Sequence, residues 1–363
     1  MKHPVLACLG LLLCHGAAQG ADTSGETPAR EDERAGAEWL EIGGHADLDW
    51  IHTRPENQDG HAELGVSEVG LSLAAAITDW AAVEAGFLYE HTDLGEKQDV
   101  FGSEAAFLET ATFRFGPPEG PWSIAAGRQF LPFGVFDTRM ISDPLTLEVA
   151  ETNEISVSLG WSAGGLGTTL FGFAKNDGLE SANGVGGYGA AVSFSSEREK
   201  SGLSLNLALT SDFGYSANML SLLADTTAHE GPADRIAGLS AHAAARYGAA
   251  TLIAEYVGAL DSYAVREIEF AGRGAQPASW LLEAAYEFDV LGRNATAALG
   301  YQATREALAL ELPKRRLLAV LSAQIAEPLT LAVEWGRDRD YAAGNGGSGE
   351  SYNFLTAQLS WAF

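Results

Sequence analysis

The last thirteen residues, SYNFLTAQLSWAF, alternate between apolar and polar side chains, and this period of two limits the possible folds more than any other feature of the chain. Successive side chains of an extended strand point to opposite faces. The mostly apolar face carries Asn353, Leu355, Ala357, Leu359, Trp361 and Phe363. The other face carries Tyr352, Phe354, Thr356, Gln358 and Ser360. An apolar face toward lipid and a polar face toward an aqueous interior are typical of a strand in a transmembrane β-barrel.

Segments of the same kind follow one another from Trp39 to the end without a domain break. Each is near the ~10 residues that cross a bilayer at a tilt, and we expect about sixteen of them. The predicted strands are 40–52, 64–77, 81–90, 104–115, 122–131, 154–161, 166–175, 187–195, 203–212, 236–247, 251–260, 278–288, 294–304, 314–325, 329–335 and 351–363.

The connections between these strands alternate in length. Short ones are 78–80, 116–121, 162–165, 196–201, 248–250, 289–293 and 326–328. Long ones are 53–63, 91–103, 132–153, 176–186, 213–235, 261–277, 305–313 and 340–350. Short periplasmic turns alternating with long external loops predict an all-β fold, a porin-like transmembrane up-and-down antiparallel β-barrel with both termini in the periplasm. Sixteen strands enclose a lumen too wide for side chains alone to fill, which predicts a channel.

The N-terminus predicts export from the cytoplasm. Lys2, the apolar stretch 5–13 and small residues before Ala21 form the pattern of a secretory signal peptide over residues 1–20, which contains both cysteines. Residues 21–38 are acidic and without periodicity, and predict a mobile periplasmic segment before the barrel at 39–363. The terminal Phe363 resembles the C-terminal signature of bacterial outer-membrane proteins, so we expect location in the outer membrane of a Gram-negative bacterium.

Charge narrows the function further. The chain has 49 acidic and 22 basic residues and a formal net charge of −27. Nucleic acid is therefore excluded as an expected partner, because binding to it needs clustered basic residues. A pore that concentrates anions is disfavoured for the same reason, since it would need rings of Arg or Lys. A mean hydropathy of −0.01 agrees with a barrel, because the two faces of each strand cancel in any average.

The third long connection is expected to control what passes. In sixteen-stranded porins the third loop folds into the lumen and narrows it. Here the predicted constriction carries five acids and one base: Asp137, Arg139, Asp143, Glu148, Glu151 and Glu154. A negative constriction favours cations, and Arg139 opposite the acids would give a transverse field that orients dipolar solutes. The alternative is an ordinary solvated loop outside the barrel.

The same region carries a family resemblance. The runs GRQFLPFG (127–134), SDPLTLE (142–148) and ETNE (151–154) resemble the LbtU-type siderophore porins. The resemblance is most specific over residues 120–160 and elsewhere consists of barrel architecture alone. It implies passage of an iron-siderophore complex, whereas period and charge imply only a cation-preferring pore.

Two charges break the pattern of strands 104–115 and 122–131. If Phe113, Phe115 and Trp122 face lipid, parity places Glu109 and Arg128 there too. Counting outward from the turn GPPEGP places Glu109 directly opposite Arg128, as a self-compensating pair. One interpretation is a subunit interface in a homotrimer. The other is a bulge near Gly127 that turns both side chains into the lumen.

Other polar residues are candidates for the lumen wall. His45, Asp47 and Asp49 share one face of the first strand in a row that could hold a cation, although a hydrophilic wall explains them as well. The remaining wall candidates are His242, Arg246, Glu255, Glu283 and Glu334. We expect no cofactor and no bound metal.

The sequence therefore predicts a passive outer-membrane porin that is in contact with lipid and lipopolysaccharide and that passes small solutes. The family resemblance implies that ferric siderophore is one of them. A general cation-preferring porin is the alternative within this class. An outer-membrane hydrolase is disfavoured, because Ser240 and His242 lie two apart on one strand and no third catalytic residue is evident. We expect no enzymatic activity.

Overall fold

The computed structural model describes residues 39–55, 60–90, 106–117, 120–176, 182–227 and 235–363. The predicted signal peptide and acidic segment, together with the second long connection, lie outside the described residues and stay predictions.

Sixteen strands of the described chain form one sheet. They are β1 (Leu40–Pro55), β2 (His61–Thr78), β3 (Ala81–Glu90), β4 (Ala106–Phe115), β5 (Trp122–Phe130), β6 (Asn153–Ala163), β7 (Leu166–Asn176), β8 (Ala182–Arg198), β9 (Ser201–Thr210), β10 (Gly238–Tyr247), β11 (Ala250–Ala259), β14 (Ala278–Val290), β15 (Arg293–Arg305), β16 (Arg315–Ala326), β17 (Leu329–Arg339) and β18 (Ser351–Ala362). A small hairpin pairs β12 (Glu269–Phe270) with β13 (Arg273–Gly274).

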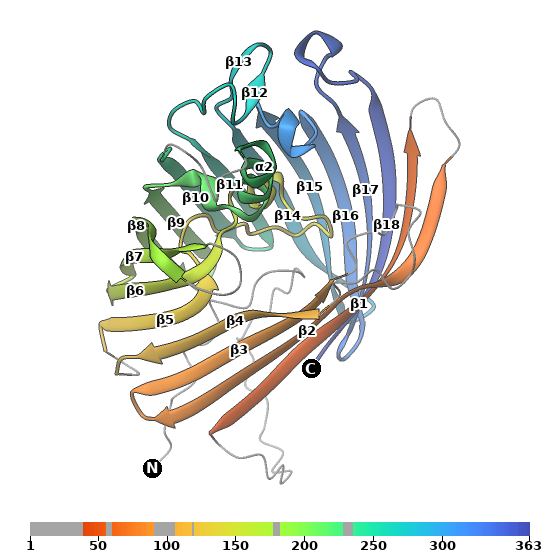
Figure 1. Ribbon diagram of the computed structural model, residues 1–363. Coiled ribbons are helices and arrows are strands. Elements are labelled where there is room, and N and C mark those ends of the chain that lie inside the picture. The colour runs from red at the N-terminus through yellow and green to blue at the C-terminus, as the bar shows by residue number, and fades with distance from the viewer. Residues whose placement is uncertain (1–38, 56–59, 91–105, 118–119, 177–181, 228–234) are drawn as a thin grey trace.

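The sheet closes on itself because β1 pairs with both β2 and β18, and every neighbouring pair is antiparallel. Figure 1 shows the strands tilted around a common interior. Closure satisfies every backbone ladder and leaves no sheet edge, which lipid requires. The predicted sixteen-stranded antiparallel barrel is thus confirmed.

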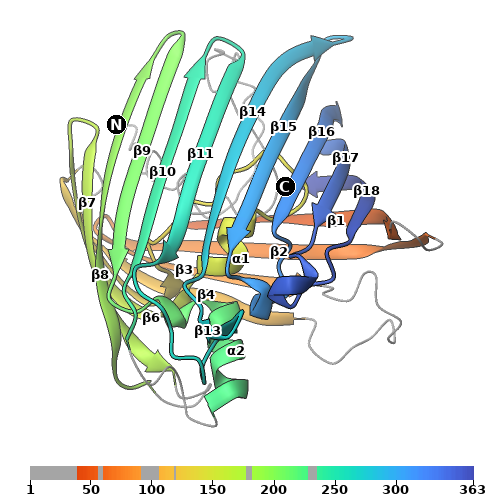
Figure 2. The same ribbon diagram turned by 90° about the horizontal axis from the view of Figure 1, so that it is seen from above.

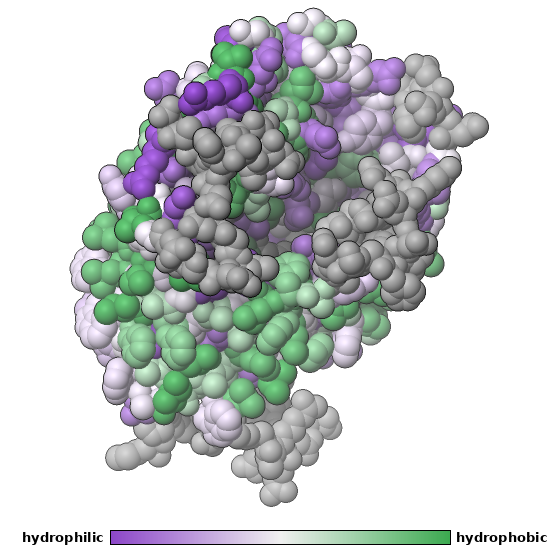
Figure 3. Space-filling model, viewed as in Figure 1, coloured by the Kyte–Doolittle hydropathy of each residue, from purple (hydrophilic) through white to green (hydrophobic). Residues whose placement is uncertain are grey.

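The outer surface carries the apolar face of the strands. On β6 the exposed Ile155, Val157 and Leu159 alternate with buried Glu154 and Ser156. Figure 3 shows hydrophobic residues gathered over the outer side of the sheet. A closed barrel with this surface is stable only in lipid, and the protein is a β-barrel of the bacterial outer membrane. Among the described residues, no helix is both long and apolar enough to cross a membrane.

The long connections contain structure that the sequence did not predict. Connection β5–β6 includes α1 (Leu145–Ala150), and β9–β10 includes η2 (Phe213–Tyr215) and α2 (Ala217–Thr227). Connection β11–β14 holds the β12–β13 hairpin, and the last two external connections hold η3 (Leu308–Leu310) and η4 (Ala343–Asn345). These short elements lack the periodicity that marks the strands, because they pack against one another rather than against lipid.

The hydrophobic core lies inside the barrel, not between two sheets. The buried cluster joins three long connections to the inner wall: Phe133 and Val149 from the first, Met219 and Leu223 from the second, and Ile268 from the third. Burying each such side chain contributes roughly 1.5–3 kcal/mol. One side of the lumen is consequently filled by packed apolar side chains.

Candidate functional site

The connection between β5 and β6 folds back against the inner wall of the barrel. We call residues 131–152 the inner segment. Its helix α1 contacts β11, β14 and β15, and Figure 2 shows α1 within the ring of strands. The backbone N–H groups of such a buried segment need acceptors, and the wall provides them.

Three glutamates of the wall hold the inner segment. They are Glu255 on β11, Glu283 on β14 and Glu334 on β17, and all three are buried. The sequence predicted them as lumen wall residues. In the structure each one accepts hydrogen bonds from backbone N–H groups, in addition to side-chain hydroxyls, of the inner segment. A charged acceptor makes a hydrogen bond roughly twice as strong as a neutral one.

The first two glutamates hold the beginning of the inner segment. Glu255 accepts from the backbone N–H of Val135 at 2.7 Å and from the hydroxyl of Thr146 at 2.8 Å. Glu283 accepts from the backbone N–H of Arg139 at 2.9 Å. Because Val135 and Thr146 are eleven residues apart and share one carboxylate, Glu255 also closes the segment into a loop.

The third glutamate holds the middle of the segment. Glu334 accepts from the backbone N–H of Ile141 at 2.7 Å and of Ser142 at 3.2 Å, and the Ser142 hydroxyl donates to it as well. The side-chain oxygen of Gln302 on β15 accepts from the backbone N–H of Leu145 at 2.8 Å. The attachment therefore runs along consecutive strands on one side of the barrel.

A cavity of about 560 Å³ lies beside the inner segment and is lined by residues of β1, β2, β3, β16, β17 and β18. Its lining is strongly acidic. The acidic lining residues are Asp47, Asp49, Glu68, Glu90, Asp143, Glu148 and Glu151, and the basic one is Arg139. The inner segment and the opposite wall both contribute carboxylates, so a solute in this cavity has negative charge on two sides.

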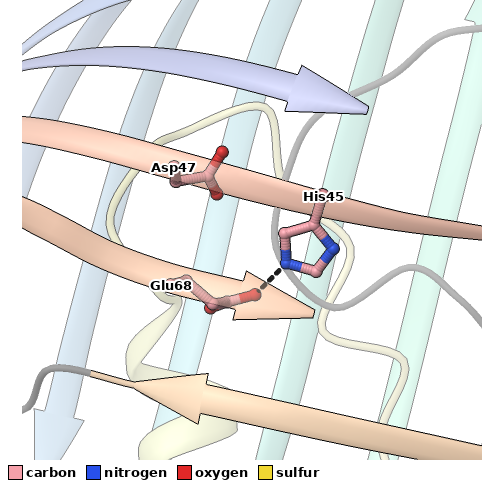
Figure 4. A group of neighbouring side chains, drawn as sticks. All are labelled: His45, Asp47 and Glu68. Carbon is pink, nitrogen blue, oxygen red and sulfur yellow. Dashed lines mark hydrogen bonds and ion pairs between the residues drawn. The ribbon is translucent and has the colours of Figure 1, made fainter. Parts of the chain in front are cut away.

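A small cluster of metal-ligating side chains lies on the wall of this cavity. His45 and Asp47 share the inner face of β1, and Glu68 faces them from β2 (Figure 4). A ring nitrogen of His45 hydrogen-bonds the Glu68 carboxylate, and Ser360 donates to Asp47. The ligand atoms of the three residues lie within 4.8 Å of one another, so together they could hold a cation.

Electrostatic crowding is strongest at the inner segment. The pKa of Asp143 is raised to about 7, although its side chain is open to the lumen. The largest cause is desolvation by the surrounding barrel, and the negative charges of Glu148, Glu151 and Glu68 add to it. Burial also raises the pKa of Glu148, while the hydrogen bond from the amide of Asn218 opposes that shift. These carboxyls repel one another at neutral pH, and a cation between them relieves the repulsion.

One arginine borders the inner segment with its charge neutralised. Arg316 on β16 forms a bidentate ion pair with buried Asp338 on β17, with a closest distance of 2.8 Å. The hydroxyl of Tyr352 donates to the same carboxylate at 2.7 Å. Arg316 also donates to the backbone oxygen of Asp143 at 3.4 Å. This pair supports the inner segment and leaves the net charge of the passage negative.

The structure brings together only some of the residues predicted for the constriction. Arg139, Asp143, Glu148 and Glu151 line the cavity, as do the predicted wall residues Asp47 and Asp49. Asp137 and Glu154 are absent from its lining. Asp137 is near enough to His242 and Glu283 to influence them electrostatically, and Glu154 is buried at the start of β6.

The remaining wall candidates lie away from the passage. His242 is buried on β10 opposite Glu255, and neither of its ring nitrogens has a hydrogen-bond partner in the described part of the chain. Arg246 forms an ion pair of 2.8 Å with Glu197 on β8. The hydroxyl of Ser240 is likewise buried and has no hydrogen-bond partner among the described residues, so it does not hydrogen-bond His242 there.

The predicted pairing of Glu109 with Arg128 is wrong. Arg128 lies opposite Ala111 in the β4–β5 ladder, and the pairing begins with Phe115 opposite Ile124. The register is therefore shifted by two residues from the one that counting predicts. The described β4–β5 ladder runs from Ala111 to Phe115 and therefore does not place Glu109 opposite Arg128.

A bulge explains where Glu109 goes. The β3–β4 register shifts between Gly86 and Phe87, so Glu109 changes face relative to the apolar residues of β4. Gly86 pairs with Ser72, and both belong to the inner face of the sheet. The carboxylate of Glu109 lies 3.7 Å from the position that a Cβ on Gly86 would take, so it lies on the same face. The bulge at Gly86 therefore turns Glu109 toward the lumen. The predicted bulge near Gly127, which would have turned both charges inward, is not found: the described β4–β5 ladder runs through Gly127 without a register shift, and Arg128 stays on the face of Ala111.

Sequence reasoning missed two acids of the passage, Glu68 and Glu90. The β1–β2 register shifts at Ser67, because Asp47 pairs with Glu68 and Leu48 with Val66. The signal was present in the sequence, since the polar pair Ser67-Glu68 interrupts the alternation between Val66 and Val69. A broken period of two marks a β-bulge, and the bulge turns Glu68 inward.

Comparison with known proteins agrees with this architecture. No protein-family model matches the chain. A UPF0422 protein of Legionella pneumophila (strain Lens) is 27% identical over 342 residues, which cover 85% of this chain and 63% of the relative. A UPF0422 protein of Coxiella burnetii is 25% identical over 330 residues, 84% of this chain and 68% of the relative. The chain thus spans less than two thirds of the length of the Legionella relative.

Solved structures with the same fold are porins. Pseudomonas putida OprB gives a TM-score of 0.61 at 10% identity and covers 90% of this chain and 94% of its own. The anion-selective porin from Comamonas acidovorans gives a TM-score of 0.57 at 14% identity and covers 89% and 99%. The fold is therefore that of an outer-membrane porin. Because one neighbour is described as anion-selective, charge preference must be argued from the lining residues of each chain.

Proposed function

We propose that the protein is a passive channel of the outer membrane whose acidic passage prefers cations and cationic solutes. The observation that carries the proposal is the lining of the cavity, where seven acids face one base. A unit charge 4 Å from a cation contributes about 1 kcal/mol in bulk water, and more beside a protein wall. Several carboxylates on two sides of the passage therefore favour cations strongly over anions.

Reversal potentials in a planar bilayer test the proposal. With a tenfold KCl gradient across the membrane, we expect a cation-to-anion permeability ratio of about five or more, the factor that about 1 kcal/mol corresponds to. The variant Glu148→Gln/Glu151→Gln should lower the ratio, whereas Glu197→Gln, at an ion pair away from the cavity, should not. A ratio near one in the wild type, or a plugged barrel without conductance, would contradict the proposal.

For the solute, we propose a ferric siderophore. The support is the resemblance of the runs at 127–134, 142–148 and 151–154 to siderophore porins, together with a cavity of the size range of small-molecule sites, about 300–1,000 Å³. Growth of the host on a ferric siderophore as sole iron source should require the gene. Unchanged growth after deletion, combined with the cation preference above, would favour a general cation-preferring porin instead.

A further inference from the structure

Five basic side chains gather at the external rim of the barrel, where β15, β16 and β17 meet the external connections. They are Arg305, Lys314, Arg315, Arg337 and Arg339, and we call them the basic rim patch. None of them lines the acidic cavity, and the arginines of β16 and β17 lie on the opposite face of the sheet. Their concentration is unexpected in a chain with 49 acids and 22 bases.

The strand periodicity fixes the outward orientation of three of them. On β16, Leu318 and Val320 are buried while Leu317 is exposed, so Arg315 shares the outer face with Leu317. On β17, buried Glu334 and Asp338 face inward, and the alternate, odd-numbered residues of the strand face outward. Arg337 and Arg339 are on that outward face.

The arrangement places like charges directly opposite each other. Arg315 pairs in register with Arg339, and Arg337 pairs with Leu317. Like charges across an antiparallel ladder are destabilising. Among the described residues, none of the three arginines forms an ion pair, whereas the inward neighbour Arg316 is fully paired with Asp338. Repulsion left uncompensated in the folded protein points to an anion supplied from outside the chain.

The patch also has a recess. A cavity of about 240 Å³ is lined by Lys314, Arg315, Arg339, Asp340, Ala342 and Gly349. The carboxylate of Asp340 is engaged elsewhere, since it accepts from the backbone N–H of Ser348 and of Tyr341, each at 2.6 Å. The ammonium of Lys314 lies 5.6 Å from the centre of the Tyr341 ring. The recess is therefore bordered by three cations and one carboxylate that does not pair with them.

The apolar belt begins directly below the patch. Leu317, Leu321, Val333 and Trp335 are exposed on the same face of β16 and β17. An aromatic residue such as Trp335 is typical of the boundary between lipid chains and headgroups. The arginines thus lie at headgroup level in the external leaflet, with surface for acyl chains immediately beneath them.

We propose that the basic rim patch binds the phosphate groups of lipopolysaccharide in the external leaflet. Arginine donates paired N–H groups that match phosphate oxygens, and one phosphate between Arg315 and Arg339 would neutralise their repulsion. A lipid-borne phosphate fits better than a free one, because the charged recess is continuous with the apolar belt.

Thermal unfolding in detergent tests the site. The variant is Arg315→Gln/Arg337→Gln/Arg339→Gln, and the matched control is Arg198→Gln/Lys200→Gln/Arg293→Gln, which removes three exposed charges at the turns of the opposite end. Without lipid, the rim variant should unfold at the same temperature as the wild type or higher, because repulsion is removed. Added lipopolysaccharide should raise the unfolding temperature of the wild type and control, and leave that of the rim variant unchanged.

Direct binding supplies the second readout. Fluorescent lipopolysaccharide should bind the rim variant at least tenfold more weakly than the wild type, and dephosphorylated lipopolysaccharide should bind both equally weakly. Equal affinity of wild type and rim variant would overturn the proposal. It would also be overturned if dephosphorylated lipid bound the wild type as tightly as the intact lipid, or if inorganic phosphate alone gave the full stabilisation.

Discussion

Carboxylates of this barrel serve two purposes, and their hydrogen bonds distinguish them. Glu255, Glu283 and Glu334 accept backbone N–H groups and hold the inner segment. Asp143 and Glu148 project into the passage and leave charge available to a solute. Two residues of the same type therefore give different predictions when they lose their charge.

Loss of charge at Asp143 should remove a pH dependence. Its pKa is raised to about 7, so the carboxyl is neutral below and negative above that pH. We expect cation selectivity to increase between pH 6 and pH 8 in the wild type, measured as the reversal potential. Asp143→Asn should keep the lower selectivity across this range. A pH dependence that survives in this variant would assign the titration to another group.

Loss of charge at Glu334 should loosen the inner segment. Glu334→Gln retains one acceptor but loses charge-assisted hydrogen bonds that contribute about 1.5–3 kcal/mol. We expect larger current fluctuations in single-channel records, because the segment detaches more often. Asp49→Asn is the matched control, since it removes a buried lumen charge that does not contact the inner segment. Equal fluctuations in both variants would argue against an anchor at Glu334.

At the scale of the element, the β4–β5 hairpin depends on one glycine. Gly127 has φ +139°, and a Cβ there would lie 2.0 Å from the backbone oxygen of Ala111. Gly127→Ala should lower stability by at least about 2 kcal/mol, through backbone strain and the clash. Heat-modifiable migration on gels measures the loss. Gly172→Ala, where the nearest atom is 3.9 Å away and φ is unstrained, should unfold like the wild type.

Strands were predictable because lipid and water impose a strict period on them. Where the period breaks, counting residues failed, as at Ser67 before Glu68 and at the β3–β4 register shift that leaves Glu109 between two ladder pairs. A bulge moves every later side chain to the other face, so one unrecognised bulge reverses an assignment. The β4–β5 register also differed from the count, because the length of a turn is not fixed by the alternation.

The negative charge of the passage was predictable from the sequence, but the full set of residues that line it was not. The acids of 132–153 indicated a negative passage, and four of the six residues named for it line the cavity. Their partners Glu68 and Glu90 come from distant strands, and only the three-dimensional arrangement reveals them. The packing of Met219 and Leu223 against Phe133 also depends on contacts between distant connections, which no local pattern encodes.

At the scale of the whole molecule, closure makes β18 indispensable. β18 pairs with β1 on one side and β17 on the other, in ladders that start at His45–Ala362 and Leu329–Trp361. Removing residues 351–363 would leave β1 and β17 with unpaired backbone groups in lipid. Each unpaired group costs several kcal/mol. We expect no insertion into vesicles, measured by resistance to added protease.

A deletion of similar position but different role serves as the control. Removing residues 343–346 shortens the external connection before β18 and leaves every barrel ladder intact. This variant should insert and resist protease like the wild type. Insertion of the chain without β18 would mean that closure is not needed for the lipid-embedded state.

The one-sided attachment of the inner segment separates two demands that evolution places on the same chain. Stability in the bilayer depends on the barrel wall, whereas the choice of solute depends on the inner segment, which is attached to strands on one side of that wall. Substitutions in the inner segment can change the width of the passage while the barrel stays unchanged. Homologous barrels can therefore diverge in solute specificity without changes in the strands that determine folding and membrane insertion.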